Sequence, residues 1–205
     1  MKFPDNINQL SDLQIDYIGF IFYEKSKRFV GDLLEQFSLE TFLKSIKKVG
    51  VFVNSSFDTI LNANLKYHFD YIQLHGNESP EFCEQLFNGG FKIIKAFQIS
   101  GEFDFFTCKA YENVCDYFLF DTKTDKFGGS GQLFDWKLLE NYKLDTKFFL
   151  SGGISIENME QIHSFSHSRL HALDLNSKFE LSAGLKDISK LRLFLEKINL
   201  NNEKR

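Results

Sequence analysis

The chain has 205 residues, of which 43% are hydrophobic and 25% charged, an ordinary balance for one globular domain with a full core. Its net charge of −4 comes from both signs mixed along the sequence, so no basic block is available to bind nucleic acid or a membrane surface. No stretch approaches the roughly 18 apolar residues of a membrane span, and the N-terminus lacks the apolar core of a signal peptide. We therefore expect one cytoplasmic domain over residues 1–205, with neither a nucleic-acid nor a membrane partner.

The cysteines also favour a cytoplasmic location. Cys83, Cys108 and Cys115 are odd in number and form no C-x-x-C pair and no Cys/His ligand spacing. This pattern argues against a disulfide framework and against a zinc site, and it is typical of a reducing environment. We interpret the three thiols as small, half-buried apolar side chains and expect no metal.

Seven apolar runs of strand length follow one another along the chain. Most are continuously hydrophobic rather than alternating, and they are rich in Phe, Ile, Val and Tyr, which is typical of parallel strands covered on both faces. The predicted strands are Tyr17–Tyr23, Val49–Asn54, Tyr71–Gly76, Lys92–Ile99, Tyr117–Thr122, Phe148–Gly153 and His171–Ser177.

The segments between the strands have helical features. Ser79-Pro80-Glu81 and Ser155-Ile-Glu-Asn158 are typical helix starts, with a capping hydroxyl before acidic residues. Two sets of apolar residues have the spacing of one helical face, namely Leu39, Phe42, Leu43 and Ile46, and Leu185, Ile188, Leu191, Leu195 and Ile198.

Repeated β-α units allow two architectures, an open doubly wound sheet or a closed (β/α)8 barrel. The G-x-G-x-x-G fingerprint of dinucleotide-binding sheets is absent after the first predicted strand, which weakens the first option. Polar residues close nearly every strand, which favours a barrel with its site at the carboxyl ends of the strands. Such a barrel has eight strands, whereas this sequence shows seven.

Polar side chains end several predicted strands. Gln73 and His75, two residues apart, point to the same side of their strand, and Asp121 ends the fifth run. Asp174 and Asn176 share one face of the seventh run. Any one of these is more often a helix cap or a satisfied core group. Taken together on one rim, they favour a functional site.

Arg28 lies in the basic loop that directly follows the first run. Most such loops are solvated charge clusters, but a guanidinium can also bind a carboxylate through two parallel hydrogen bonds. The loop sequence alone leaves both interpretations open.

Three further loops are candidates for anion binding, because exposed backbone N–H groups ahead of a helix attract phosphate. In barrels, phosphate commonly binds at the loops after the last two strands. The three loops are Gly128-Gly-Ser-Gly131, Ser151-Gly-Gly153 and Asn176-Ser177, and the last two occupy those places.

Read together, these stretches resemble one family, phosphoribosylanthranilate isomerase of tryptophan biosynthesis. In order and at matching spacing they cover nearly the whole chain. They are Gly19–Phe29, Val49–Asn54, Ile72–Gly76, Leu119–Thr124, Gly128–Gly131, Phe134–Trp136, Leu150–Gly153, Leu173–Ser177 and Gly184–Asp187.

The resemblance implies a (β/α)8 barrel that converts N-(5-phosphoribosyl)anthranilate into 1-(2-carboxyphenylamino)-1-deoxyribulose 5-phosphate by an Amadori rearrangement. It implies no metal and no organic cofactor, a phosphosugar substrate, and a monomer or homodimer. Asp121 matches the general acid and Arg28 matches the arginine that holds the anthranilate carboxylate. Gln73 and His75 would line the pocket. The phosphate would be held by backbone at Gly152, Gly153, Asn176 and Ser177.

The start of the chain departs from the family pattern. Family members open with a strand that ends in Cys-Gly, and this cysteine is the general base, whereas Met1-Lys-Phe-Pro-Asp5 resembles the segment just after it. We expect the first strand and its cysteine to be absent from this sequence, which puts its activity in doubt. An upstream start explains this better than a true truncation, which would leave two neighbouring strands unpaired.

Two alternatives remain open from the sequence. One is another phosphosugar barrel, such as the indole-glycerol-phosphate synthase that follows in the same pathway, although no lysine and glutamates stand at early strand ends as that enzyme requires. The other is a non-catalytic module that binds a phosphate ligand.

Overall fold

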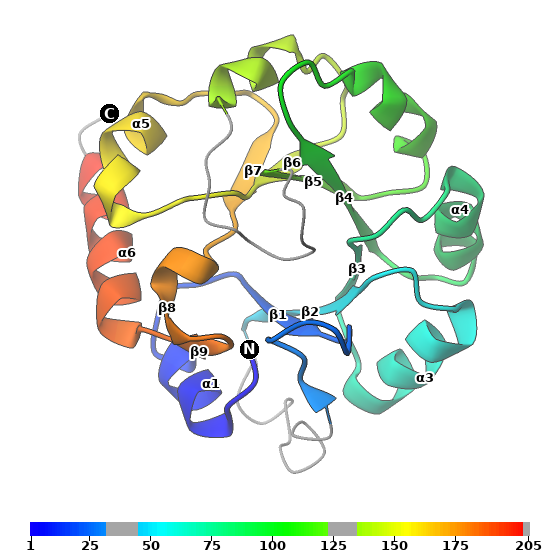
Figure 1. The fold of residues 1–205 in the computed structure, drawn as a ribbon, viewed down its shortest axis with the longest axis horizontal. Coiled ribbons are helices and arrows are strands. Elements are labelled where there is room, and N and C mark those ends of the chain that lie inside the picture. The colour runs from blue at the N-terminus through cyan, green and yellow to red at the C-terminus, as the bar shows by residue number, and fades with distance from the viewer. Residues whose placement is uncertain (32–44, 123–134, 203–205) are drawn as a thin grey trace.

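In the computed structural model, residues 1–31, 45–122 and 135–202 are described, and within them seven parallel strands pair in chain order. Figure 1 shows these strands curled around a central axis, with the helices on the outside. The strands are β1 (Tyr17–Ile21), β2 (Lys47–Phe52), β3 (Tyr71–Leu74), β4 (Ile93–Ile99), β5 (Tyr117–Thr122), β6 (Phe148–Leu150) and β7 (Leu170–Leu173). All seven predicted strands are confirmed. Most of them end a few residues earlier than predicted, so that the polar residues at their carboxyl ends lie beyond the paired part of the sheet.

The connections between strands carry α-helices and shorter 3-10 helices. The α-helices are α1 (Pro4–Ser11), α3 (Phe57–Tyr67), α4 (Pro80–Asn88), α5 (Met159–Ser164) and α6 (Ile188–Asn202). The 3-10 helices are η2 (Phe105–Tyr111), η3 (Trp136–Asn141), η4 (Ile156–Asn158) and η5 (Ser177–Phe179). A short antiparallel hairpin of β8 (Glu180–Ser182) and β9 (Leu185–Lys186) precedes α6.

Both predicted helix starts are confirmed. The Ser79 hydroxyl accepts a hydrogen bond from Phe82 N at the start of α4, and Ser155 N donates to Asn158 Oδ1 ahead of η4, which continues into α5. Leu185 was predicted in the last helix but lies in β9, because residues 180–186 pair as a hairpin before α6 begins. The helix predicted around 39–46 falls mostly outside the described residues.

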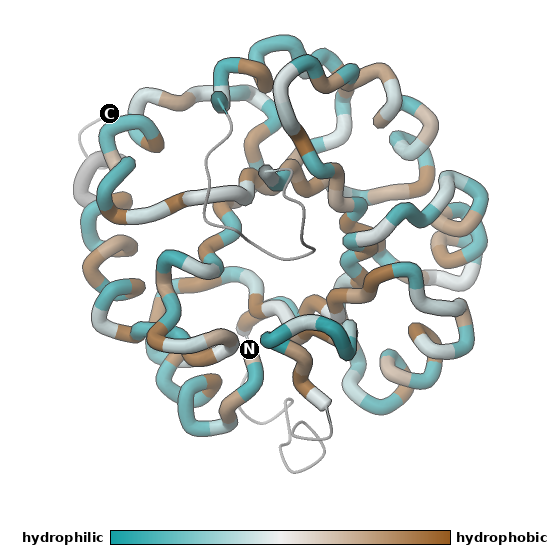
Figure 2. The backbone as a smooth tube through the Cα atoms, viewed as in Figure 1, coloured by the Kyte–Doolittle hydropathy of each residue, from teal (hydrophilic) through white to brown (hydrophobic). Residues whose placement is uncertain are grey.

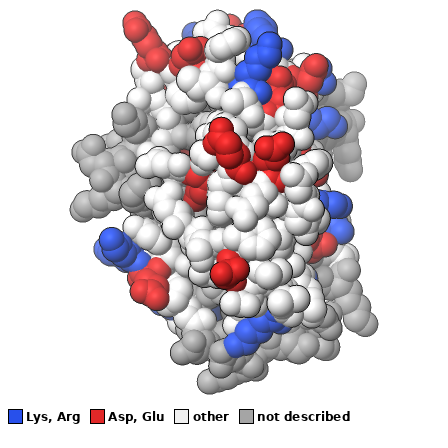
Figure 3. All heavy atoms as spheres, turned by 90° about the vertical axis from the view of Figure 1, so that its right-hand side faces the viewer, with Lys and Arg blue, Asp and Glu red and all other residues white. Residues whose placement is uncertain are grey.

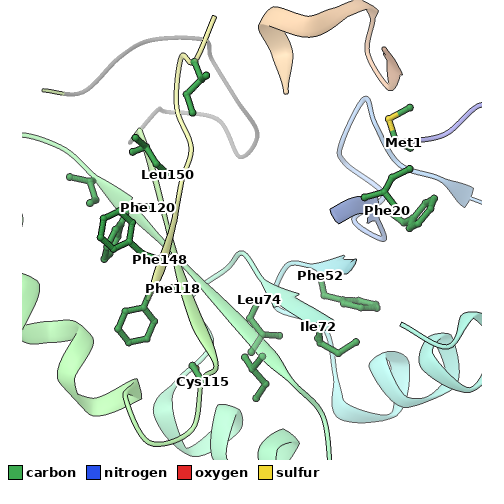
Figure 4. Packing of buried hydrophobic residues seen from close by; sticks show 14 of the residues in the cluster. Met1, Phe20, Phe52, Ile72, Leu74, Cys115, Phe118, Phe120, Phe148 and Leu150 are labelled. Carbon is green, nitrogen blue, oxygen red and sulfur yellow. The ribbon is translucent and has the colours of Figure 1, made fainter. Parts of the chain in front are cut away.

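The strands separate two hydrophobic layers, because successive side chains point to opposite faces. The outer layer packs between sheet and helices, and Figure 4 shows some of its members, among them Phe118, Phe120 and Leu74. The inner layer fills the barrel with Val49, Val51, Ile94, Ala96, Leu119 and Phe149. Figure 2 shows the same division, with hydrophobic residues along the strands and hydrophilic residues on the outer turns of the helices.

An aromatic layer closes the amino end of the barrel interior. It comprises Tyr17, Tyr71, Tyr117 and His171, one from each odd-numbered strand, as expected for the layered filling of such barrels. Neighbouring ring centroids lie 5.9 Å apart for Tyr17 and Tyr71 and 5.7 Å apart for Tyr71 and Tyr117. His171 stacks on Tyr117 with centroids 4.3 Å apart. The inner face of each odd-numbered strand therefore carries an aromatic ring at its amino end, and the polar groups lie at the carboxyl ends of the strands.

Within the described residues the sheet does not close, because β1 and β7 are its two end strands. Side chains nevertheless connect them, since the Tyr17 hydroxyl lies 2.8 Å from His171 Nε2. We call the space between β1 and β7 the seam.

The charge on one face of the molecule is mixed in sign. On the face that carries α3 and α4, acidic and basic side chains are scattered among neutral ones (Figure 3). In the parts of the chain that are described, no helix combines the length and apolarity needed to cross a bilayer.

Candidate active site

A cavity of about 440 Å³ opens at the carboxyl ends of the strands. Eight of the residues that the sequence predicted for the site lie in its wall, although they come from distant parts of the chain. They are Arg28, Gln73, His75, Asp121, Gly152, Gly153, Asn176 and Ser177. The structure therefore brings these eight residues together. The loop Gly128–Gly131 lies outside the described residues.

Asp121 stands at the centre of a short polar chain. Its Oδ1 accepts a hydrogen bond from Thr122 N at 2.9 Å, and its Oδ2 lies 3.6 Å from His75 Nε2. Gln73 Nε2 lies 2.8 Å from His75 Nδ1. With the Gln73 amide assigned as the donor, Nδ1 is the acceptor, and this assignment directs the ring proton on Nε2 toward Asp121. The imidazole is placed to stabilise a negative charge on Asp121.

A second carboxyl group stands beside the first. Asp174 follows β7, and its Oδ2 accepts a hydrogen bond from Ser151 Oγ at 3.0 Å. Desolvation raises the pKa of Asp174, and the charge of nearby Asp121 raises it further. Two carboxyl groups in different surroundings are a common basis for acid–base chemistry.

Arg28 is held by a buried ion pair. Its Nε lies 3.0 and 2.9 Å from Glu180 Oε1 and Oε2, and its Nη2 lies 2.7 Å from Oε2. The Arg28 side chain is 15% exposed and that of Glu180 is 5% exposed. Although burial acts in the opposite direction, the Arg28 hydrogen bond and the Lys186 charge lower the pKa of Glu180 below its usual range. Glu180 is therefore an anion. Of the two interpretations of Arg28 that the sequence left open, the structure agrees with a guanidinium that binds a carboxylate and not with a solvated charge.

Lys186 extends this ion pair to the loop after β7. Its Nζ lies 3.5 Å from Glu180 Oε1 and donates to Leu175 O at 3.0 Å and to Asn176 Oδ1 at 3.1 Å. Burial lowers the pKa of Lys186, while the Glu180 charge opposes that shift. The ammonium group therefore binds Asn176, one of the predicted phosphate-binding residues, to the same network as Arg28.

The loop after β6 requires glycine. Gly152 has φ +89°, and a Cβ at this position would lie 2.3 Å from Thr122 Oγ1 and 2.9 Å from Thr122 N. Gly153 also has positive φ, at +72°. This backbone can approach β5 closely only without side chains, so its peptide groups lie directly on the cavity wall.

The cavity also extends down the seam. Besides rim residues, its wall includes Gly19 and Ile21 of β1, Ala172 and Leu173 of β7, and Leu191, Phe194, Leu195 and Ile198 of α6. The apolar face of α6 thus borders an open channel between the end strands of the sheet.

No cysteine lines this cavity in the described part of the chain. Cys83 lies in α4, Cys108 in η2 and Cys115 just before β5. All three are free thiols, and they are buried rather than half-buried as the sequence predicted. The described ranges also contain no cluster of three His, Cys, Asp or Glu side chains suited to a metal ion.

Sequence reasoning missed two residues of the site, Glu180 and Lys186. Glu180 lies 152 positions from its partner Arg28 in the sequence. Lys186 belongs to the matched segment Gly184–Asp187, which was the available signal for it. No local pattern marks Glu180.

Comparisons with known proteins identify the family of the chain. Residues 2–197 match the family model described as N-(5'-phosphoribosyl)anthranilate isomerase. A relative of that name from Parabacteroides distasonis is 50% identical over 199 residues, which cover 97% of this chain and 90% of the relative. A second from Phocaeicola vulgatus is 38% identical over 97% of this chain and 94% of its own length.

Solved structures show the same barrel. The phosphoribosyl anthranilate isomerase of Thermotoga maritima superposes with a TM-score of 0.81 at 32% identity, covering 97% of this chain and 95% of its own. A related isomerase in complex with reduced 1-(o-carboxyphenylamino)-1-deoxyribulose 5-phosphate has a TM-score of 0.79 at 28% identity, with the same coverage of both chains. Together with the family-model match, these relatives show that the chain belongs to the N-(5'-phosphoribosyl)anthranilate isomerase family.

Proposed function

We propose that this protein performs the Amadori rearrangement of N-(5-phosphoribosyl)anthranilate in tryptophan biosynthesis, with Asp121 as the general acid. The observation that carries the proposal is the convergence of Asp121, the Arg28 guanidinium and the two phosphate-type loops on one cavity. A related isomerase binds the reduced product analogue, which has a carboxylate at one end and a phosphate at the other. The site offers a group suited to each end.

The reaction needs one proton donor and one proton acceptor. Asp121 gives its proton to the furanose ring oxygen, the bond from this oxygen to C1 breaks, and an iminium forms between C1 and the anthranilate nitrogen. A base then takes the proton from C2, which leaves an enolamine that tautomerises to the ketose. The proton loss leaves Asp121 as a carboxylate, and His75 Nε2, 3.6 Å from Oδ2, stabilises that charge.

Substrate binding is divided between the two ends of the cavity. Arg28 holds the anthranilate carboxylate, while Gln73 and His75 line the space between the ends. Backbone at Gly152, Gly153, Asn176 and Ser177 holds the phosphate, since these loops follow the last two strands of the sheet. The two proton transfers require an acid and a base, and neither step calls for a metal or an organic cofactor.

We further propose that the general base lies on an additional strand in the seam. Two observations support it: in the described residues the sheet ends at β1 and β7, and the apolar face of α6 borders the gap between them.

The upstream codons test this second proposal. In-frame codons before Met1 that encode a short apolar strand ending in Cys-Gly would support it, and a stop codon directly before Met1 would contradict it. We expect the chain extended by these residues to turn over substrate, and the 205-residue chain to bind it with far lower turnover.

The activity itself is tested by the loss of anthranilate fluorescence as phosphoribosylanthranilate is consumed. Asp121→Asn in the extended chain should lower kcat by about 10² to 10⁴-fold, as expected for loss of a general acid, while affinity for the reduced product analogue stays nearly unchanged. Substantial residual turnover would show that Asp121 is not the general acid. Binding without any turnover by the unsubstituted extended chain would instead identify a binding module.

Two expectations of the sequence remain predictions. A cytoplasmic location agrees with three buried free thiols. A monomer or homodimer is the expected assembly, and a related Thermotoga maritima isomerase is described as dimeric.

A further inference from the structure

Arg28 and Glu180 meet along one specific edge of the guanidinium group. The hydrogen bonds run from Nε and Nη2 of Arg28 to both carboxylate oxygens of Glu180, at 2.7 to 3.0 Å. A guanidinium has two edges that can bind a carboxylate in bidentate fashion, the Nε–Nη2 edge and the Nη1–Nη2 edge. Glu180 uses the first, and the second lies outside this pair.

Glu180 is itself firmly held. It begins β8, its Oε1 accepts a hydrogen bond from Gly184 N at 3.2 Å, and Lys186 Nζ lies 3.5 Å from the same oxygen. One backbone contact and one side-chain contact from the same hairpin therefore fix the position of the Glu180 carboxylate. Such an anchor fixes the plane of the guanidinium and reduces the side-chain entropy that substrate binding would otherwise cost.

We propose that Glu180 is a positioning residue, which holds Arg28 by its Nε–Nη2 edge so that the Nη1–Nη2 edge meets the aryl carboxylate of the substrate. The inference rests on the proposed function, since it requires Arg28 to bind that carboxylate. It goes further, because it makes Glu180 a determinant of selectivity. The protein prefers an ortho-carboxylated aniline to plain aniline only while this anchor keeps both its length and its two acceptor oxygens.

Charge and position can be separated by substitution. Glu180→Asp keeps the negative charge but withdraws the carboxylate by one methylene group, so only the position changes. Glu180→Gln keeps the length but removes the charge, which leaves Arg28 and Lys186 without their shared anion. If Glu180 acted only through its charge, Gln would strengthen the binding of every anion and Asp would change little.

The test measures calorimetric affinity of the full chain for two ligands. One is reduced 1-(2-carboxyphenylamino)-1-deoxyribulose 5-phosphate, and the other is the same compound without its aryl carboxylate. The ratio of the two dissociation constants measures the carboxylate preference. Both Glu180→Asp and Glu180→Gln should reduce this ratio about tenfold or more, the typical size of lost hydrogen bonds to a charged group. Affinity for the ligand without the carboxylate should change little.

Glu157→Gln is the matched control, because Glu157 forms an exposed pair with Lys190 at 3.9 Å and lies outside the cavity wall. It should leave the ratio unchanged. A wild-type ratio in Glu180→Asp, or an equal loss of affinity for both ligands, would overturn the inference. Thermal unfolding identifies a variant that fails to fold.

If a Glu180 variant fails to fold, a substitution of Arg28 tests the same inference. Arg28→Lys keeps a cation that can pair with Glu180 but has no second edge, so the carboxylate preference should disappear. Its persistence would overturn the inference. A wild-type protein that binds neither ligand would contradict the proposed function itself, whereas normal wild-type binding with an unaltered ratio in the Glu180 variants would contradict only the role of Glu180.

Discussion

His75 Nε2 lies 3.6 Å from Asp121 Oδ2, with the imidazole held from its other side by Gln73. This contact is longer than a full hydrogen bond. The ring is nevertheless oriented by Gln73, and a donor at Nε2 attracts the carboxylate form of Asp121 more strongly than its protonated form. This is the behaviour expected of a group that stabilises a transition state more than the ground state.

Loss of the Gln73 hydrogen bond should impair the chemical step. We expect Gln73→Leu to lower kcat by about 10 to 100-fold with little change in KM, because a misoriented imidazole no longer faces Asp121. Steady-state kinetics of the active chain measure this effect. Gln85→Leu, on the exposed side of α4, is the control and should behave as wild type. A variant with unchanged kcat would show that Gln73 has no orienting role.

The loop after β3 should depend on a buried ion pair. Lys95 Nζ lies 3.1 Å from Glu78 Oε2 and donates to Gly76 O at 2.8 Å, and both charged side chains are at most 3% exposed. Lys95→Met leaves Glu78 buried without its cation, and we expect a loss of about 3 to 5 kcal/mol in the free energy of unfolding. Urea denaturation provides the measurement.

The exposed pair of Lys47 and Asp70, at 3.4 Å, gives a direct control. Lys47→Met should change the free energy of unfolding by about 1 kcal/mol or less, because solvent screens this pair. Equal effects of the two substitutions would contradict a special role for the buried pair.

Replacement of Gly152 should affect both stability and substrate binding. Gly152→Ala combines a positive φ with a Cβ placed 2.3 Å from Thr122 Oγ1. We expect a loss of about 1 to 3 kcal/mol from backbone strain, a further loss from the clash, and a higher KM because the phosphate loop must move. Gly90→Ala is a matched control, since Gly90 has φ +83° but a Cβ there meets nothing within 4 Å. Similar results for both variants would show that the contact with Thr122 is unimportant.

The aromatic layer should make stability depend on pH. Burial lowers the pKa of His171, so below the ordinary histidine value of about 6.5 the unfolded chain binds more protons than the folded one. The free energy of unfolding should therefore fall as the pH decreases through this range. Urea unfolding measured near pH 7.5 and near pH 5.5 should show the fall in wild type and a smaller fall in His171→Phe.

A second histidine and a control variant determine how the pH experiment is interpreted. His167 also has its pKa lowered by burial, so the dependence should shrink in His171→Phe rather than vanish. Tyr17→Phe removes the 2.8 Å contact with His171 but keeps the titrating ring, and it should retain most of the dependence. A His171→Phe protein with the full wild-type dependence would assign the effect to other groups.

The sequence by itself determined the order of the elements and the rim that carries the site. Continuous apolar runs separated by helical segments predicted the parallel strands, because a strand covered on both faces must be hydrophobic throughout. Period-two spacing predicted that Gln73 and His75 share a face, and both line the cavity. Leu185 was assigned wrongly because its apolar spacing continues that of α6, while the pairing that makes it a strand comes from β8.

Only the tertiary structure decided which groups meet. Glu180 binds Arg28 across 152 positions of sequence, and Lys186 links the same carboxylate to Asn176. Such pairs depend on how loops after different strands approach one another, and no local pattern encodes that approach. The folded chain also decided that Arg28 is buried and paired rather than solvated, because burial depends on neighbours that are distant in the sequence.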